Sequence, residues 1–259
     1  MRKKLILFWA FLKRQYVYFR RYLFNSLGGM LTLYVVFLLI LGGYKGLVAP
    51  AGTEGDTLEA LVVGYVLWFF LMTSYQDVYN TVRNESLTGT LEQLYMSTHG
   101  FGWVMGANVA AAFLANLVMV ALLLTAALWT SGAVVNIDVG GLLPVLVGTL
   151  FGPVAIGFAA AGLALVFKRI DSYTQMVQFV LIALVAVPAE KAFWLRLLPG
   201  SFGASLVRDI MIRGQSLLEI GLAKLVLLFL IGIGHLALGY GVYKVCEKRA
   251  MVWGMLGHY

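Results

Sequence analysis

Long apolar runs, separated by short polar stretches, dominate this 259-residue chain and limit what it can fold into. Of its residues, 61% are hydrophobic and only 12% are charged, and the mean hydropathy is +0.88. A helix needs about 20 apolar residues to cross the hydrocarbon core of a bilayer, so roughly six spans with short loops use the whole length. The sequence therefore predicts an all-α polytopic membrane protein, residues 1–259, with a single transmembrane domain.

Six apolar runs are the candidate transmembrane spans. They cover residues 27–48, 60–79, 104–129, 139–167, 172–187 and 217–245, and the fifth is barely long enough to cross. The fourth run contains Gly148 and Gly152 in a GxxxG pattern, which Ala155 and Ala159 continue at the same spacing. Small residues at this spacing are typical of helices that pack closely in membranes.

Two segments outside these runs have amphipathic patterns. Residues 1–25 carry seven bases and no acid, and their apolar residues recur every three or four positions, which predicts an amphipathic helix on the membrane interface. A charge cluster that only sets topology is the alternative. Pro199 and Gly200 divide residues 188–215 into two pieces with apolar faces. We expect a re-entrant extracellular helical hairpin there, with a plain loop as the alternative.

The distribution of basic residues predicts the orientation in the membrane. With six spans, thirteen Lys and Arg residues fall on the side of the two termini and six fall on the opposite side. Because basic loops stay in the cytoplasm, both termini are expected there, in a cytoplasmic (inner) membrane. The net charge of +7 is spread over loops and termini, so nucleic acid is not an expected partner.

Several kinds of chemistry find no support in the sequence. No lysine precedes Ser or Thr, so the phosphate-binding pattern GxxxxGK[ST] is absent. Cys246 is the only cysteine, and His99, His235 and His258 lie far apart, which gives no metal-ligand spacing. The acidic residues are also scattered, so an integral membrane enzyme or a regulatory anchor remains only as a weaker alternative. We expect no catalytic residue, metal or cofactor in this chain.

The most unusual segment is a polar island, residues 84–97, with the sequence NESLTGTLEQLYMS. It lies between the second and third predicted spans, on the cytoplasmic side of the predicted topology. Leu87, Leu91, Leu94 and Tyr95 recur at helical spacing and give it one apolar face. Such a helix docks into a groove of a partner, or it merely joins the two spans.

The island also carries a family resemblance. Its pattern E-x-x-x-G-T-L-E-Q-L followed by M-S resembles the type 2 permeases of ATP-binding cassette (ABC) transporters, in which this segment forms the coupling helix. Residues 197–214 are similar to the hairpin of that family, and the ending with Ala250, Gly254, Leu256 and Gly257 is similar to its A-x-x-x-G-x-L-G tail. Thr98 and His99 depart from the family, which commonly has proline there.

The resemblance implies a permease subunit of an ABC exporter, without an ATPase site of its own. Its implied partners are a second permease copy, identical or related, and two separate ABC ATPase subunits that bind ATP and Mg. The implied substrate is amphipathic, such as a drug, an antibiotic or a lipid-like molecule, with polysaccharide or glycolipid export as the alternative. Residues matching the coupling motif are Glu85, Gly89, Thr90, Leu91, Glu92, Gln93 and Leu94. We expect Glu85 and Glu92 to make polar contacts with the ATPase, and Leu91 and Leu94 to fill a groove on it. The alternative is that these residues only keep the helix soluble and pack within the chain.

Polar residues inside the predicted spans are candidates for a transport pathway, because polar groups are costly in lipid and tend to face the interior of a bundle. These residues are Asn108, Asn116, Gln175, Gln178 and His235. Gln175 and Gln178 share one face of the fifth span. His235 stands alone, and we interpret it as a packing residue in preference to a proton carrier.

Overall fold

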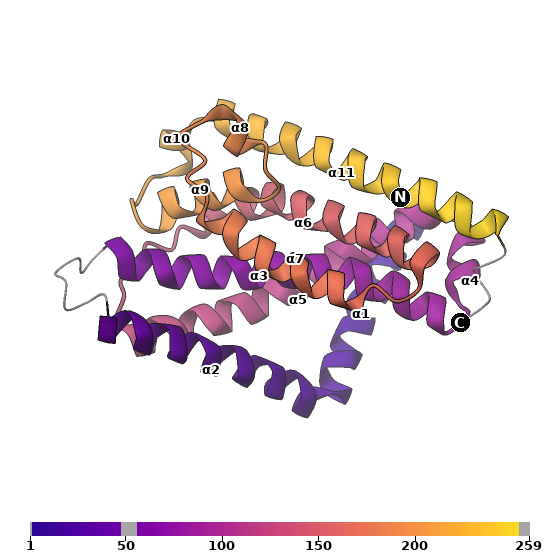
Figure 1. The fold of residues 1–259 in the computed structure, drawn as a ribbon, viewed down its shortest axis with the longest axis horizontal. Helices are drawn as coiled ribbons and strands as arrows, with labels where there is room; N and C mark the ends of the chain where they lie inside the picture. The colour runs from indigo at the N-terminus through magenta and orange to yellow at the C-terminus, as the bar shows by residue number, and fades with distance from the viewer. Residues whose placement is uncertain (1, 48–55, 254–259) are drawn as a thin grey trace.

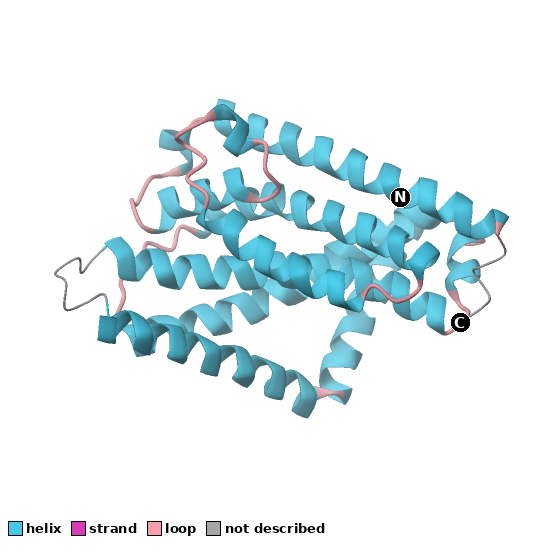
Figure 2. Cartoon of the chain, in the orientation of Figure 1, coloured by secondary structure: helices cyan, strands magenta, loops and turns pink. Residues whose placement is uncertain are grey.

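The computed structural model describes residues 2–47 and 56–253, and within these residues it contains helices and no strands (Figure 2). The helices are α1 (Arg2–Arg21), α2 (Leu23–Leu47), α3 (Asp56–Leu87), α4 (Leu91–Tyr95), α5 (Phe101–Ser131), α6 (Val139–Phe167), α7 (Asp171–Ala186), α8 (Phe193–Arg196), α9 (Ser201–Met211), α10 (Leu217–Ile220) and α11 (Leu222–Val252). The predicted all-helical class is therefore confirmed.

The long helices form a bundle with different short helices at its two ends (Figure 1). The helices that run along its long axis are α2, α3, α5, α6, α7 and α11, whereas α1 crosses the bundle. At one end, α4 lies beside the end of α11. At the opposite end lie α8, α9 and α10. The polar island and the hairpin segment are thus at opposite ends of the molecule.

Five helices are long and apolar enough to cross a membrane, and they define a multi-pass membrane protein. They comprise residues Leu23–Gly46, Leu58–Leu87, Phe101–Ser131, Val139–Phe167 and Leu222–Val252. α7 is also apolar but has only 16 residues, or roughly 24 Å of helix. α6 has the bounds that the sequence predicts, and there Asp138 accepts a hydrogen bond from the N–H of Gly140 at 3.1 Å as the N-cap.

Two glycines change the predicted boundaries. α3 continues to Leu87, and Gly89, with φ of +70°, separates it from α4, so the prediction of one helix over residues 84–97 was wrong. Gly221, with φ of +82°, likewise divides the predicted run 217–245 into α10 and α11. Other residues rarely adopt this left-handed region, so a glycine that does so usually marks the end of a helix.

α6 lies at the centre of the bundle because its small residues let neighbouring backbones approach closely. A methyl group added at Gly157 would lie 2.7 Å from the carbonyl oxygen of Tyr75 in α3. One added at Gly162 would lie 2.8 Å from the Cα atom of Tyr243 in α11. From the other side, one added at Gly239 would lie 2.2 Å from the carbonyl oxygen of Ala155. At the predicted positions Gly148 and Gly152, a methyl group would lie 2.7 Å from the side chain of Leu228 and 2.9 Å from the backbone nitrogen of Gly200, so the predicted close packing is confirmed.

The segment between α7 and α11 consists of short helices, with a break where the sequence places one. Gly200 has a left-handed conformation, with φ of +80°, and separates α8 from α9. α9 is buried along almost its whole length and packs against α6, α7 and α3. Arg208 of α9 donates hydrogen bonds to the carbonyl oxygens of Val185 and Val187, at the end of α7. These bonds satisfy carbonyl oxygens at the end of α7 that have no hydrogen-bond partner within the helix.

The remaining parts of the fold are α2 and the last residues of the chain. α2 stands largely apart from the bundle, and only 6% of its most apolar stretch is buried. At the end of the chain, Ala250 is fully buried, whereas Gly254, Leu256 and Gly257 of the predicted tail motif lie outside the described residues.

Candidate functional site

The polar island forms a tight corner between α3 and α4, which we call the α3–α4 corner (residues 84–97). The hydroxyl of Thr88 donates to the carbonyl oxygen of Asn84 at 2.9 Å, within the last turn of α3. The chain then turns at Gly89, and the N–H of Thr90 donates to the carbonyl oxygen of Glu85 at 2.9 Å. The corner is therefore held by its own backbone and short polar side chains.

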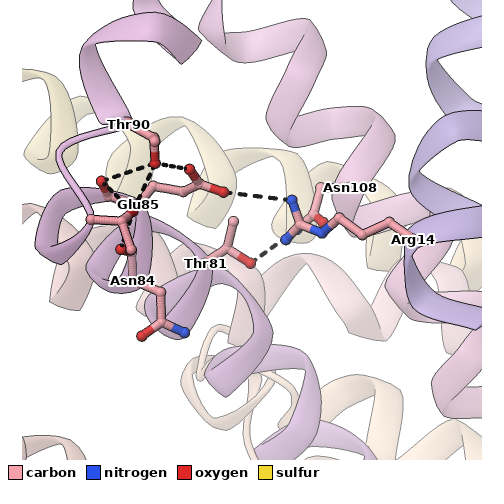
Figure 3. A network of polar contacts seen from close by, with 7 residues as sticks. Arg14, Thr81, Asn84, Glu85, Thr90 and Asn108 are labelled. Carbon is pink, nitrogen blue, oxygen red and sulfur yellow. Dashed lines mark hydrogen bonds and ion pairs between the residues drawn. The ribbon is translucent and has the colours of Figure 1, made fainter. Parts of the chain in front are cut away.

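Glu85 connects this corner to α1 (Figure 3). Its carboxylate accepts a hydrogen bond from the hydroxyl of Thr90, and its other oxygen lies 3.6 Å from Nη1 of Arg14. The Glu85 side chain is 22% exposed and the Arg14 side chain is 46% exposed, so water reaches this pair. Exposed ion pairs contribute little energy, so this contact joins α1 to the corner without holding α1 in place, and α1 packs mainly against α5. Glu85 thus has partners within its own chain.

α4 is attached to α11 through an aromatic cluster. The hydroxyls of Tyr95 and Tyr243 hydrogen-bond each other, and the ring of Phe101 stacks on Tyr243 with centroids 5.1 Å apart. Nζ of Lys244 lies 5.8 Å from the Tyr95 ring and 2.6 Å from the carboxylate of Glu247. Tyr243 is fully buried. Movement of α4 would therefore disturb the end of α11 as well as α1, α3 and α5.

The outward surface of the corner differs from the one the sequence predicts. Leu91 is only 2% exposed and packs into the core of the chain, so its predicted role of filling a groove on a partner was wrong. Leu94 is partly buried against the same core. The exposed residues are Asn84, Leu87, Thr88, Gly89, Glu92, Gln93 and Met96. Because Leu91 is needed inside, the adjacent Glu92 and Gln93 point outward.

Two of the five predicted pathway residues lie at the interface between α3 and α5, about two helical turns apart. The amide nitrogen of Asn108 donates to the hydroxyl of Thr81 at 3.3 Å, and that of Asn116 donates to the carboxylate of Asp77 at 2.6 Å. Asn108 is 1% exposed, and its carbonyl oxygen Oδ1 has no hydrogen-bond partner among the described residues. Two separate polar contacts therefore link α3 to α5.

The other three predicted pathway residues lie elsewhere. Gln175 is exposed on α7, and Gln178 is partly buried on the same helix. The backbone carbonyl of Gln178, and not its side chain, accepts a hydrogen bond from Nε1 of Trp68 at 3.0 Å. Nε2 of His235 lies 2.9 Å from the carbonyl oxygen of Leu197, and so connects α11 to the end of α8. These three side chains do not form one site with Asn108 and Asn116.

Sequence reasoning missed Arg14, Asp77 and Thr81 as members of these contacts. Asp77 is the only acidic residue within the run 60–79, and Asp77, Thr81 and Glu85 follow one another at intervals of four residues. This spacing places the three on one face of a helix. The sequence therefore indicated a polar face on α3. The contact of Arg14 with Glu85 was not indicated, because it depends on how α1 folds back against the bundle.

A charged cluster lies at the opposite end of the bundle. Nη1 of Arg213 lies 2.8 Å from the carboxylate of Glu190 and 2.6 Å from that of Asp209. The hydrogen bond from Arg213 holds the pKa of Glu190 below its usual value. Burial, together with the nearby charge of Glu190, raises the pKa of Asp209. The cluster ties the segment after α7 to the end of α9.

An apolar cleft of about 790 Å³ lies between α5, α6 and α11, and Phe8 of α1 contributes to its wall. Its other lining residues include Gly106, Val109, Phe158 and Tyr240. None of the five predicted pathway residues lines it. A cleft with these walls suits a hydrocarbon chain or an aromatic ring and offers almost no polar contact.

Comparison with known proteins does not assign the chain to a family. No protein-family model matches it, and no curated protein or solved structure gives a significant match. Among the residues that the structure describes, no group of three or more His, Cys, Asp or Glu side chains is arranged to hold a metal ion.

Proposed function

We propose that this chain is the permease subunit of an ABC exporter, driven by separate ATPase subunits that dock on the α3–α4 corner. The proposal combines the sequence resemblance with the geometry of this corner. The observation that carries most weight is that one small element, α4, contacts α3, α5 and α11 and is joined to α1 through Glu85 and Arg14.

This geometry allows a partner protein that binds the corner to displace α4. Glu92 and Gln93 are exposed at the end of the bundle, beside the exposed apolar side chains of Leu87 and Met96. The polar and apolar groups together resemble the face of a helix that lies in a groove of a partner. A displacement of α4 would pass to several long helices, because tightly packed elements shift as units between discrete arrangements.

The proposed topology has six crossings, with α7 as the short fifth one and with both termini and α4 on the cytoplasmic side. The α8–α9 hairpin then lies on the extracellular side and re-enters the membrane. α1, with exposed Leu5, Trp9 and Tyr16 and a series of bases, lies on the cytoplasmic interface. A second permease copy would complete the transport pathway, and α2, with only 6% of its most apolar stretch buried, offers an uncovered apolar surface for such contacts.

The proposed substrate is amphipathic or lipid-like, because the cleft between α5, α6 and α11 is apolar and polar residues within the described bundle are few. A glycan would need many hydrogen-bonding groups along its route, so this chemistry favours a substrate with a substantial apolar part.

The direct test is capture of the ATPase. A cysteine introduced at Gln93 should crosslink to an ABC ATPase, identified by its GxxxxGK[ST] sequence, when the two are expressed together from the genes that flank this one. Cysteine at Gln175, which is exposed on α7 away from the corner, is the matched control. The proposal fails if Gln93 gives no crosslink to any ATPase while the permease is correctly inserted.

A further inference from the structure

A line of polar side chains runs along one face of α3, from the α3–α4 corner into the bundle. Asp77, Thr81 and Glu85 are each one turn apart, and each faces a polar partner from another helix. These partners are Asn116 and Asn108 of α5 and Arg14 of α1. Part of this line, from Arg14 to Asn108, is visible in Figure 3. We call these six residues the polar ladder.

The inner end of the polar ladder lies well within the length of the apolar span, where Asp77 and Asn116 are partly buried. Asp77 belongs to the candidate span Leu58–Leu87 and lies ten residues, or about 15 Å, before the last residue of α3. Its partner Asn116 is the middle residue of α5. A carboxyl group at this depth is expensive to keep charged unless it has a cation or several donors.

Within the described residues, no cation is paired with Asp77, and its one side-chain partner is the amide of Asn116. α5 and α6, which pack against α3, contain no Asp, Glu, Lys, Arg or His. The charged residues of neighbouring helices have other partners. Asp171 of α7 pairs with Arg83, and Arg14 of α1 pairs with Glu85. α9 brings Arg208, which is bonded to backbone carbonyls at the end of α7, and Asp209, which pairs with Arg213.

A second observation indicates that another molecule binds within the polar ladder. The Oδ1 atom of Asn108 is buried without a hydrogen-bond partner, midway between Asp77 and Glu85. An unpaired acceptor in the interior is costly, and a bound water molecule or a mobile proton donor is the usual remedy. Asn108 thus provides an intermediate acceptor between the membrane-depth carboxyl and the water-accessible Glu85.

We propose that Asp77 is a proton-binding site that exchanges protons with the Glu85 end of α3 through water held at the unpaired Oδ1 atom of Asn108. On protonation the carboxylate oxygen forms an O–H bond with a proton supplied by water, and on release the proton returns to water at Glu85. The carboxyl becomes neutral in one state and charged in the other, with no other bond made or broken. This inference is independent of the proposed role in export.

The first test is infrared spectroscopy of the protein in lipid nanodiscs, titrated from about pH 5 to about pH 9, a range that covers perturbed carboxyl groups. A carboxylic-acid C=O band should disappear as the pH rises, and the same band should be lost at all pH values in Asp77→Asn. Asp171→Asn, which removes a carboxyl group at the surface end of α7, should retain it. A band that persists in Asp77→Asn, or that does not change with pH, overturns the proposal.

Deuterium exchange tests the route. In Asn108→Leu the shift of this band in D₂O should be at least ten times slower than in the wild type. Thr125→Val, which removes an exposed hydroxyl of α5 that bonds only to its own helix, should exchange at the wild-type rate. An unchanged rate in Asn108→Leu removes Asn108 from the route and overturns that part of the proposal.

A carbodiimide provides a test that needs no variant to fold. The acid proton passes to a carbodiimide nitrogen as the carboxylate oxygen bonds to the central carbon, and rearrangement gives a stable N-acylurea that contains every atom of both reactants. Mass spectrometry of the wild type should find this adduct at Asp77, with a yield that falls as the pH rises. Absence of the adduct, or a yield at Asp77 that does not vary with pH, counts against the site.

Discussion

Tyr95 of α4 and Tyr243 of α11 share a hydrogen bond between their hydroxyls, although 148 positions separate them in the chain. It joins the α3–α4 corner to a helix that the sequence gives no reason to associate with it. Tyr243 is fully buried, so its hydroxyl has no access to water if this bond is lost.

Tyr95→Phe should therefore lower the free energy of unfolding by about 1–3 kcal/mol, because it leaves the Tyr243 hydroxyl buried without a partner. The double variant Tyr95→Phe/Tyr243→Phe should recover part of this loss, since both polar groups are then removed. Thermal unfolding in one detergent, arranged as a double-mutant cycle, measures the coupling. A simple sum of the two single effects would show that the bond contributes nothing.

Leu91 and its neighbour Glu92 should respond in opposite ways to substitution. Leu91→Ala should destabilise the fold by about 2–5 kcal/mol, because it leaves a cavity in the core. Glu92→Lys should leave the unfolding temperature nearly unchanged but reduce ATPase binding, since Glu92 is exposed. Leu87→Ala, at a side chain that is 46% exposed, is the matched control for the loss of an apolar group. Normal ATPase binding by Glu92→Lys would place the docking surface elsewhere.

Glycines in α11 allow a matched test of helix packing. Gly239→Ala should destabilise the protein by about 1–3 kcal/mol, because the new methyl group would overlap the backbone of Ala155. Gly241→Ala lies two residues further along, where nothing is within 4 Å, and should be neutral or stabilising by up to about 1 kcal/mol. Equal unfolding temperatures for the two variants would contradict the close contact between α6 and α11.

The pairing of Glu190 with Arg213 predicts a dependence of stability on acid. Because the native pKa of Glu190 is lowered, the native state gains stability above the usual glutamate pKa of about 4.3 and loses it as the pH falls through the lower native value. The side chain is 51% exposed, so the gain should be below about 1 kcal/mol. As the pH falls from the usual glutamate pKa through the lower native pKa, the difference in unfolding free energy between the wild type and Glu190→Gln should become smaller.

The same measurement in the background Arg213→Gln provides the control. There Glu190 has lost the donor that lowers its pKa, so Glu190→Gln should no longer change the dependence on pH. A persistent difference would mean that another group is responsible.

Much of the fold follows from local sequence signals. α6 begins after Asp138, which caps it, and it ends where Lys168 and Arg169 interrupt the apolar run, so its bounds agree with the prediction. The break at Pro199 and Gly200 was also apparent, because these residues favour turns. The division at Gly89 was missed, because Leu87, Leu91 and Leu94 keep a helical spacing across it and only the observed φ reveals the turn.

The candidate site was less accessible to sequence reasoning. Periodicity gave α4 one apolar face, but it could not show whether Leu91 faces the core of this chain or a partner. The bond between Arg14 and Glu85 depends on the path of α1 across the bundle, which no local pattern encodes. Asp77 could have been identified, because an acidic residue inside a span is itself a signal of function.

In the proposed topology with six crossings, the short length of α7 makes the thickness of the bilayer a property that the protein must match. Roughly 24 Å of helix falls short of a hydrocarbon core of about 30 Å. Arg208 occupies the carbonyl groups at the end of α7, so the helix can stop below the headgroups without exposing them to lipid. Lipids around α7 should therefore be locally compressed, and membranes with shorter acyl chains should accommodate the protein at the lowest elastic cost.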